Sequence, residues 1–258
     1  MSVEILVTGG TGVLGRQVAE RLRSAGAGVR VMSRSGKPGT VHGDLLTGEG
    51  LERAVRGVDT IVHCATSPFR KPELVDVGGT DNMLRIAARA GVSHCLYISI
   101  VGIDGAASYP YYDIKLETER VVADSPVPHT ILRATQFHDL IFLAVRFLDR
   151  LPVIPLPFGF LGQPIDSGEV ADRMVKLALS EPAGRAPDIG GPEVAPLEDA
   201  VRTYLDVKGS SKRIVRLPFP GKTARAFREG AIVCPDNRYG MITWEEFLQA
   251  ELPTESAA

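Results

Sequence analysis

Short apolar runs alternate with amphipathic stretches along the first part of the chain. The runs, rich in β-branched and other apolar residues, occupy residues 3–8, 28–33, 59–65, 94–100 and 129–133. Apolar residues at helical spacing fill the intervals at 13–25, 49–56, 78–90 and 112–124. Strands that alternate with helices indicate parallel βαβ units, and crossovers between parallel strands are nearly always right-handed. The pattern predicts an α/β fold on a doubly wound parallel sheet, with a ligand crevice at the carboxyl ends of the strands.

Three glycines spaced three residues apart follow the first of these runs. Gly9 permits a tight turn, Gly12 lets the backbone approach a phosphate, and Gly15 lets the next helix pack close to the strand. The N-terminus of that helix offers unpaired N–H groups and the positive end of the helix dipole to an anion. Because the triplet stands between a strand and a helix, it predicts a Rossmann fold that binds the pyrophosphate of a dinucleotide.

The pattern changes after about residue 150. Helical spacing recurs at 167–180, 195–207, 221–230 and 243–250, between stretches rich in proline and glycine. We expect residues 1–150 to form the dinucleotide-binding core. Residues 151–258 should form a smaller, substrate-facing part that is interleaved with it. The length of 258 residues suits one large α/β domain with such an addition.

Charge and cysteine content narrow the classes of function. The net charge of −2 argues against nucleic acid or an anionic membrane as the main partner. The cysteines at 64, 95 and 234 lack CxxC or Cys/His ligand spacing, so we expect neither a metal site nor a disulfide framework. The chain begins directly with its first strand, which leaves no room for a signal peptide and favours a cytoplasmic location.

The most membrane-like segment is residues 140–160. Charged residues and Pro152, Pro155 and Pro157 interrupt it, so it falls short of the roughly 20 consecutive apolar residues that a span requires. We therefore expect no membrane partner. We interpret the segment as a buried helix followed by a proline-rich apolar loop that could cover a pocket.

The end of the second strand bears on the choice of dinucleotide. An acidic residue there would bond the 2′-hydroxyl of NAD, whereas an arginine accommodates the 2′-phosphate of NADP. Here the turn reads Ser33, Arg34 and Ser35, with no acidic residue. The guanidinium can make a forked contact with a phosphate flanked by two hydroxyls, so the sequence favours NADP(H) over NAD(H). A solvated surface arginine is the alternative.

Asp44 and Leu45, which follow a short strand-like segment, are further candidate cofactor contacts. The carboxylate of Asp44 could lie near the adenine amino group, or it could cap a turn.

Candidate chemistry lies in Ser99, Tyr111 and Lys115. Ser99 ends the fourth apolar run, and Tyr111 and Lys115 are four residues apart, on one face of the next helix. An ammonium group beside a phenol stabilises the phenolate, so this tyrosine could donate a proton to a carbonyl oxygen as hydride arrives. Ser99 could hold the same oxygen, and Lys115 could also bond the ribose of the cofactor. A helix-surface pair without a function is the alternative, but the preceding strand-end serine favours catalysis.

With these motifs in place, the chain resembles the atypical short-chain dehydrogenases/reductases, specifically the NmrA-like NAD(P)H-binding family. The resemblance covers nearly the full length. It rests on residues 8–15, 43–45, 63–68, 79–84, 99–102, 110–115, 130–137, 189–192 and 243–247.

The resemblance implies how a bound NADP would be held. By similarity, the pyrophosphate would contact Thr11, Gly12, Val13 and Leu14. Ala65 and Thr66 would lie along the ribose, and Gln136 and Phe137 beside the nicotinamide. Extended relatives often carry asparagine at the position of Asp76.

Some members of this family reduce quinones or other carbonyls. Others bind the dinucleotide as redox-sensing regulators that act through a protein partner. The retained Ser99, Tyr111 and Lys115 favour a reductase, and the non-catalytic sensor is the alternative. An epimerase or dehydratase on the same fold is a third hypothesis, without a clear nucleotide-sugar site to support it.

The substrate is expected to be a small apolar carbonyl compound or quinone. Aromatic residues in loops that should converge above the nicotinamide are the candidate contacts, although each could instead belong to the core. They are Phe69, Tyr109, Phe137, Phe158 and Phe160. His63 is interpreted as an interior residue. His138 is interpreted as a helix cap or core contact, and a catalytic role is the alternative. The chain is expected to be a monomer or a homodimer.

Overall fold

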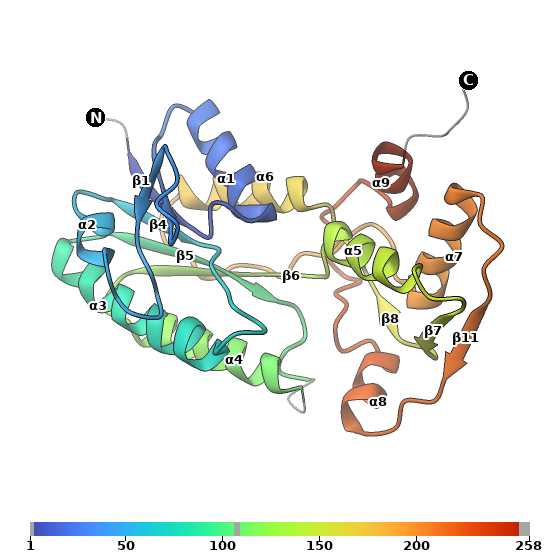
Figure 1. The fold of residues 1–258 in the computed structure, drawn as a ribbon. Helices are drawn as coiled ribbons and strands as arrows, with labels where there is room; N and C mark the ends of the chain where they lie inside the picture. Colours follow the sequence, from blue (N-terminus) through green and yellow to red (C-terminus); the bar gives the residue numbers. More distant parts are fainter. Residues whose placement is uncertain (1–2, 106–108, 253–258) are drawn as a thin grey trace, which may run out of the picture. The chain divides into compact units, whose positions relative to one another are not determined.

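The computed structural model describes residues 3–105 and 109–252, which divide into two compact units (Figure 1). Unit 1 consists of residues 1–99, 110–133 and 168–187, and unit 2 of residues 100–109, 134–167 and 188–258. The division differs from the expected boundary at residue 150. Residues 134–150 belong to unit 2, and residues 168–187 return to unit 1 because they supply its last helix and its last strand.

Unit 1 is built on a seven-stranded parallel sheet, which confirms the predicted doubly wound α/β fold. The strand order is β3-β2-β1-β4-β5-β6-β9. The strands are β1 (Glu4–Thr8), β2 (Gly28–Ser33), β3 (Thr40–His42), β4 (Thr60–His63), β5 (His94–Ile100), β6 (His129–Ala134) and β9 (Gly184–Arg185). The order reverses at β1, which has β2 on one side and β4 on the other. In a sheet of this kind, ligands bind at the carboxyl ends of the strands beside this switch point.

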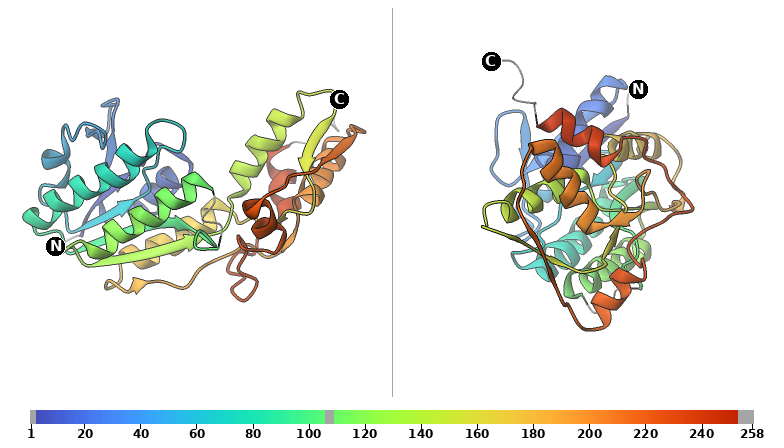
Figure 2. Two further views of the ribbon diagram at one scale, coloured as in Figure 1. Left: turned by 90° about the horizontal axis from the view of Figure 1, so that it is seen from below. Right: turned by 90° about the vertical axis from the view of Figure 1, so that its right-hand side faces the viewer.

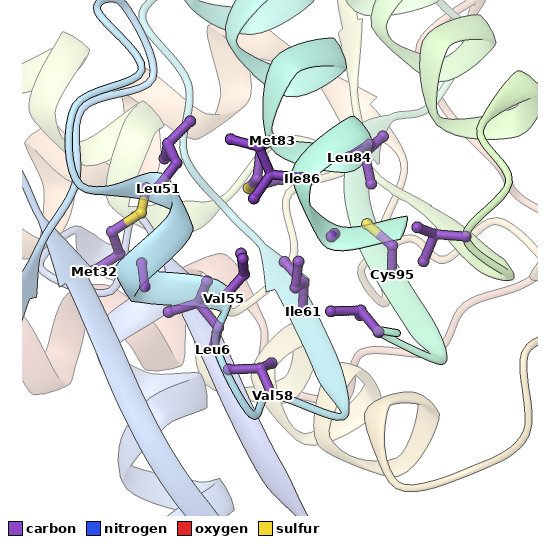
Figure 3. Close-up of a cluster of buried hydrophobic side chains, with 14 of the residues drawn as sticks. Leu6, Met32, Leu51, Val55, Val58, Ile61, Met83, Leu84, Ile86 and Cys95 are labelled. Carbon is purple, nitrogen blue, oxygen red and sulfur yellow. The ribbon is translucent and has the colours of Figure 1, made fainter. Parts of the chain in front are cut away.

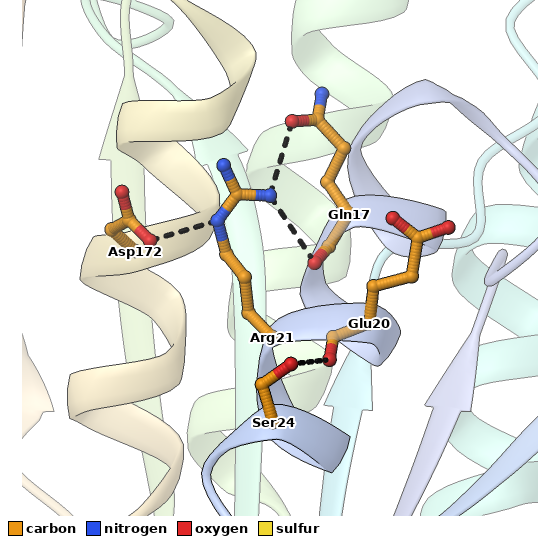
Figure 4. A network of polar contacts seen from close by, with 5 residues as sticks. All are labelled: Gln17, Glu20, Arg21, Ser24 and Asp172. Carbon is orange, nitrogen blue, oxygen red and sulfur yellow. Dashed lines mark hydrogen bonds and ion pairs between the residues drawn. The ribbon is translucent and has the colours of Figure 1, made fainter.

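Helices cover both faces of the sheet (Figure 1). One face carries α1 (Val13–Ser24) and α6 (Ser167–Ala178), and the other carries α3 (Gly79–Ala90) and α4 (Pro110–Asp124). The guanidinium of Arg21 on α1 donates to Asp172 on α6 at 2.8 Å (Figure 4). The short α2 (Leu51–Val55) packs beside α3.

The main core lies between the sheet and its α2–α4 face (Figure 3). Leu6 and Ile61 from the strands meet Leu51, Met83 and Leu84 from the helices, and all five are at most 2% exposed. Cys95 is fully buried in the same cluster, as expected for a cysteine that acts as a small hydrophobic residue. The apolar runs of the sequence are therefore buried because parallel strands have helices on both faces.

A π-helical turn, η1 (Glu73–Gly78), leads into α3. Such turns are rare, and they occur frequently at functional sites. Here the turn places Asp76, which is only 2% exposed, next to the loop that follows β4.

Unit 2 is built from helices and two small sheets (Figure 2), and it has its own core. Its elements are α5 (His138–Leu148), β7 (Ile154–Pro157), β8 (Leu161–Gly162), β10 (Ala195–Pro196), α7 (Leu197–Lys208), β11 (Ile214–Leu217), α8 (Lys222–Arg228) and α9 (Trp244–Glu251). Strand β7 pairs with β11 in parallel, and β8 pairs with β10 in antiparallel orientation. A capping box between Thr243 and Glu246 begins α9.

The segment 140–160 differs from its interpretation as a buried helix and a loop. Helix α5 buries Ile141, Phe142 and Val145, but its opposite face is apolar and exposed. The proline-rich part pairs as β7 because Pro155 and Pro157 lie in a two-stranded sheet, where few ladder hydrogen bonds are required. In the described ranges 3–105 and 109–252, no helix is both long and apolar enough to cross a membrane.

Candidate functional site

The glycine loop after β1 is packed too tightly for side chains at two of its positions. Gly9 has φ +65°, and a Cβ there would come within 2.7 Å of the backbone nitrogen of Ala65. A Cβ on Gly15 would stand 2.4 Å from the carbonyl oxygen of Gly9. These contacts match the roles expected for a tight turn and for close packing of the helix on the strand.

The start of α1 has the features of an anion site. Gly12 is the N-cap residue and supplies no side chain to the exposed N–H groups, and no acidic residue lies in the first turn. Thr11, Gly12 and Val13 are exposed, whereas the side chain of Leu14 is buried. The loop therefore fits a pyrophosphate, which could be bound by backbone N–H groups and the positive end of the helix dipole.

The turn after β2 carries Arg34 at its tip. Arg34 is exposed, and the hydroxyls of Ser33 and Ser35 lie 3.1 Å apart. Asp44 accepts a hydrogen bond from the backbone N–H of Leu46 at 2.9 Å, so its carboxylate holds a turn, the second of its two interpretations. The side chain of Leu45 is buried in the core of unit 1, so only its backbone could contact a cofactor.

The candidate chemistry gathers at the carboxyl ends of β4 and β5. Tyr111 lies in the first turn of α4, and its hydroxyl is 2.6 Å from the hydroxyl of Thr66. Thr66 donates to the carboxylate of Asp76 at 2.5 Å, and the backbone N–H of Ser67 donates to the other oxygen of Asp76 at 2.8 Å. Sequence reasoning placed Thr66 beside the ribose and assigned no role to Asp76.

Lys115 lies one turn further along α4 and is buried. Its ammonium group donates to the carbonyl of Ile98 at 3.1 Å and lies 4.3 Å from the centre of the Tyr97 ring. Burial lowers the pKa of Lys115 to about 8, although the negative charges of Asp76 and Glu119 act in the opposite direction. The lysine therefore retains a positive charge at neutral pH inside unit 1.

Ser99 ends its buried strand with an unused hydroxyl. The residue is 3% exposed, and its Oγ has no hydrogen-bond partner in the described part of the chain. A buried hydroxyl without a partner is costly, and such groups are often found where a ligand completes the hydrogen bonding. That Ser99 holds a substrate oxygen stays a prediction.

The two candidate histidines are interior residues, as expected. His63 is fully buried between the hydroxyls of Thr8 and Thr80, at 2.6 and 2.8 Å, and burial lowers its pKa to about 3. His138 in unit 2 lies against the rings of Trp244 and Phe247.

The expected substrate contacts are divided between the two units. Phe69 belongs to unit 1 and is 94% exposed. Phe160, in unit 2, packs edge-on against Phe219 and Phe227, and Phe158 lies under the guanidinium of Arg216. The role of these aromatic residues in substrate binding stays a prediction.

The other expected contacts in unit 2 have different environments. Tyr109 is 45% exposed, and Phe137 is the half-buried residue just before α5. Gln136 was expected beside the nicotinamide. Its amide donates to the carbonyl of Ile232 at 2.9 Å and accepts from the backbone N–H of Gln163 at 3.2 Å. That side chain therefore connects segments of unit 2.

Asp76 is the residue that sequence reasoning did not assign. The feature of the sequence that could have identified Asp76 is a carboxylate between two apolar residues, Val75 and Val77, just before a buried helix. A buried, isolated carboxylate requires hydrogen-bond partners. The partners, Thr66 and Ser67, come from a separate loop and are not predictable from local pattern.

Taken together, the switch point, the glycine loop and the bare helix N-terminus define a dinucleotide-binding α/β protein. A family model for NAD(P)H-binding proteins matches residues 9–181. The chain belongs to this NAD(P)H-binding family, which confirms the resemblance to NmrA-like short-chain dehydrogenases/reductases.

Two curated relatives and one solved structure show the range of similar proteins. A (4-alkanoyl-5-oxo-2,5-dihydrofuran-3-yl)methyl phosphate reductase of Streptomyces griseus is 28% identical over 88% of this chain and 86% of its own. The photosystem II assembly factor Ycf39 of Trieres chinensis is 23% identical over 84% of this chain and 72% of its own. The NADPH complex of the quinone oxidoreductase QOR2 of Escherichia coli superposes with a TM-score of 0.81 at 16% identity, covering 96% of this chain and 99% of that one.

Proposed function

We propose that this protein is an NADP(H)-dependent oxidoreductase that transfers hydride to or from an apolar carbonyl or quinone, with Tyr111 as its acid/base. The observation that carries the proposal is the position of the Tyr111 hydroxyl, 2.6 Å from Thr66 at the end of β4. Lys115 and the unpartnered hydroxyl of Ser99 come from the adjoining helix and strand. The similar reductase of Streptomyces griseus also supports a small-molecule substrate.

Each residue has a defined task in this proposal. The glycine loop and the start of α1 would hold the pyrophosphate, and the reduced dinucleotide, when bound, supplies the hydride. Tyr111 gives the proton of its hydroxyl to the substrate oxygen, which the Ser99 hydroxyl holds. The positive charge of Lys115, one turn further along α4, favours the phenolate that remains.

The preference for NADP(H) rests on the turn after β2. An exposed guanidinium flanked by two hydroxyls suits a 2′-phosphate, and the turn has no carboxylate that would repel it. A cytoplasmic location is also proposed, since Cys64, Cys95 and Cys234 are free thiols.

A second candidate function is a non-catalytic dinucleotide sensor that acts on a protein partner. The observation that favours it is the outer face of α5, where Leu140, Leu143 and Phe147 are 61%, 67% and 64% exposed. These residues follow helical spacing, so they form one apolar stripe. The similarity to an assembly factor is consistent with this alternative.

The test measures oxidation of NADPH with a panel of quinones and aromatic ketones, together with calorimetric titration of NADPH and NADH. Tyr111→Phe should lower turnover by about 100-fold or more while leaving the NADPH affinity unchanged. Tyr112→Phe, at the adjacent buried position, is the matched control and should remain active. Equal turnover by Tyr111→Phe and the wild type would refute the role of Tyr111. Tight, redox-selective binding without turnover by the wild type would favour the sensor.

A further inference from the structure

The hydroxyl of Tyr111 is connected through the hydroxyl of Thr66 to a buried carboxyl group. Tyr111 contacts Thr66 at 2.6 Å, and Thr66 contacts Asp76 Oδ2 at 2.5 Å. Asp76 Oδ1 accepts from the backbone N–H of Ser67 at 2.8 Å, which fixes the carboxyl plane. All three side chains belong to unit 1.

The protonation state of Asp76 determines which group donates in each of these hydrogen bonds. An ionised carboxylate only accepts hydrogen bonds, and a threonine hydroxyl has one hydrogen to donate. When Asp76 is ionised, Thr66 therefore donates to it, and Tyr111 must donate to Thr66. The proton of Tyr111 then points inward, away from any substrate. When Asp76 carries a proton on Oδ2, both hydrogen bonds can reverse, and Thr66 then donates to Tyr111, so that Thr66 no longer requires the Tyr111 hydrogen.

We propose that Asp76 is the proton reservoir for Tyr111, with Thr66 as the relay. This inference rests on the proposed function, because it requires that Tyr111 donate a proton to the substrate. In the reductive direction the carbonyl carbon gains a hydride from the reduced dinucleotide, and the carbonyl oxygen gains the Tyr111 proton. Tyr111 takes the hydrogen of Thr66, Thr66 takes the proton of Asp76 Oδ2, and Asp76 is left as a carboxylate. A proton from water then restores Asp76.

The surroundings of Asp76 suit a group that both holds and releases a proton. Burial raises the pKa of Asp76, whereas the hydrogen bond from Thr66, the charge of Lys115 and the N–H of Ser67 lower it. The titratable groups around it are Lys115 and Tyr111 from α4 and Tyr97 from β5, with Glu119 acting on Lys115. Burial is the largest of these effects, so the pKa of Asp76 lies above its usual value, in the direction that favours the protonated carboxyl group.

The π-helical turn is an independent feature of the same site. A π-turn has one more residue than an α-turn, and it places Asp76 toward the loop that carries Thr66. Asp81, one to two turns further on α3, is 40% exposed at its side chain and pairs with Arg85. It provides a matched carboxylate outside the relay.

The experiment compares Asp76→Asn, Thr66→Val and the control Asp81→Asn. Asparagine retains the shape and an acceptor for Ser67 N–H but cannot supply a proton, and valine interrupts the relay. Both variants should lower turnover by on the order of 10-fold or more. In the wild type, the rate should fall with rising pH as Asp76 loses its proton, and this fall should be absent from both variants. Asp81→Asn should behave as the wild type.

A second readout does not depend on turnover. Infrared titration of the cofactor-free protein should show a carboxylic-acid C=O band that is lost in Asp76→Asn and shifted in Thr66→Val. If both variants have the rate and pH profile of the wild type while Tyr111→Phe is inactive, Asp76 is not the proton reservoir. The proposed function is unaffected by that result. Absence of the band would overturn the reservoir as well. Full activity of Tyr111→Phe would instead overturn the proposed function, and the reservoir with it.

Discussion

Gly12 and Gly15 should respond differently to the same substitution by alanine. A Cβ on Gly15 would stand 2.4, 2.8 and 2.9 Å from three backbone atoms of Gly9 and Gly10. None of these atoms can swing aside, so α1 must move away from the turn until the shortest contact reaches at least 3.0 Å. On Gly12 the nearest atom is the carbonyl oxygen of Gly9 at 3.2 Å, and a small adjustment is enough.

The magnitudes follow from these contacts. Overpacking costs about 1–3 kcal/mol, and alanine in place of glycine inside a helix returns up to about 1 kcal/mol. With the full helix gain, Gly15→Ala should therefore lose up to about 2 kcal/mol of stability, together with dinucleotide binding. Gly12→Ala should lose less than about 1 kcal/mol, because only an N-cap glycine is replaced. It should still bind the dinucleotide at least about 10-fold more weakly, since its methyl group occupies the path of a phosphate.

Urea denaturation followed by circular dichroism gives the stabilities, and calorimetric titration with NADPH gives the affinities. Gly28→Ala is the control, because a Cβ there would meet only the end of the flexible Glu4 side chain. A Gly15→Ala variant that matches the wild type in both measurements would refute the geometric reasoning. Equal losses of stability in the Gly12 and Gly15 variants would refute the distinction between them.

Two further predictions concern charged residues of unit 1. Arg34→Ala should weaken NADPH binding by about 10-fold or more and leave NADH binding unchanged, because only the 2′-phosphate contacts the guanidinium. Titrations with the two dinucleotides measure both affinities, and equal losses for NADPH and NADH would contradict this prediction. Glu119 and Arg133 form a buried bidentate pair with contacts of 2.7 and 2.5 Å, so Glu119→Gln should cost about 3 kcal/mol in urea denaturation by removing the negative charge that faces the buried guanidinium. Combining Glu119→Leu with Arg133→Met should restore most of that loss, and a double variant less stable than Glu119→Gln would count against the explanation.

The sequence was sufficient for the sheet and for the glycine loop, because both depend on local patterns. Strands of five to seven residues such as β1 and β5 have clear apolar runs, and glycines at fixed spacing have few alternatives in that context. The two-residue strands β8, β9 and β10 were missed, since two residues carry no periodicity.

The site was predictable only in part. Tyr111 and Lys115 share a helix, so their spacing indicates a common face. The contact among Thr66, Asp76 and Tyr111 joins three separate segments, and it depends on a π-turn that no local pattern indicated. The same reasoning applies to Gln136, whose amide is used by distant loops of unit 2.

The interleaving of the two units has a consequence for synthesis. The chain passes from one unit to the other five times, after Ser99, Tyr109, Arg133, Ser167 and Pro187. A nascent chain of 150 residues already contains the glycine loop and Tyr111, but it lacks α6 and β9. Buried residues of α6 such as Val170 and Met174, which cover the sheet, have then not yet been translated. Unit 1 is therefore completed only after most of the protein has been translated, and a fragment that ends near residue 150 should be a client of chaperones.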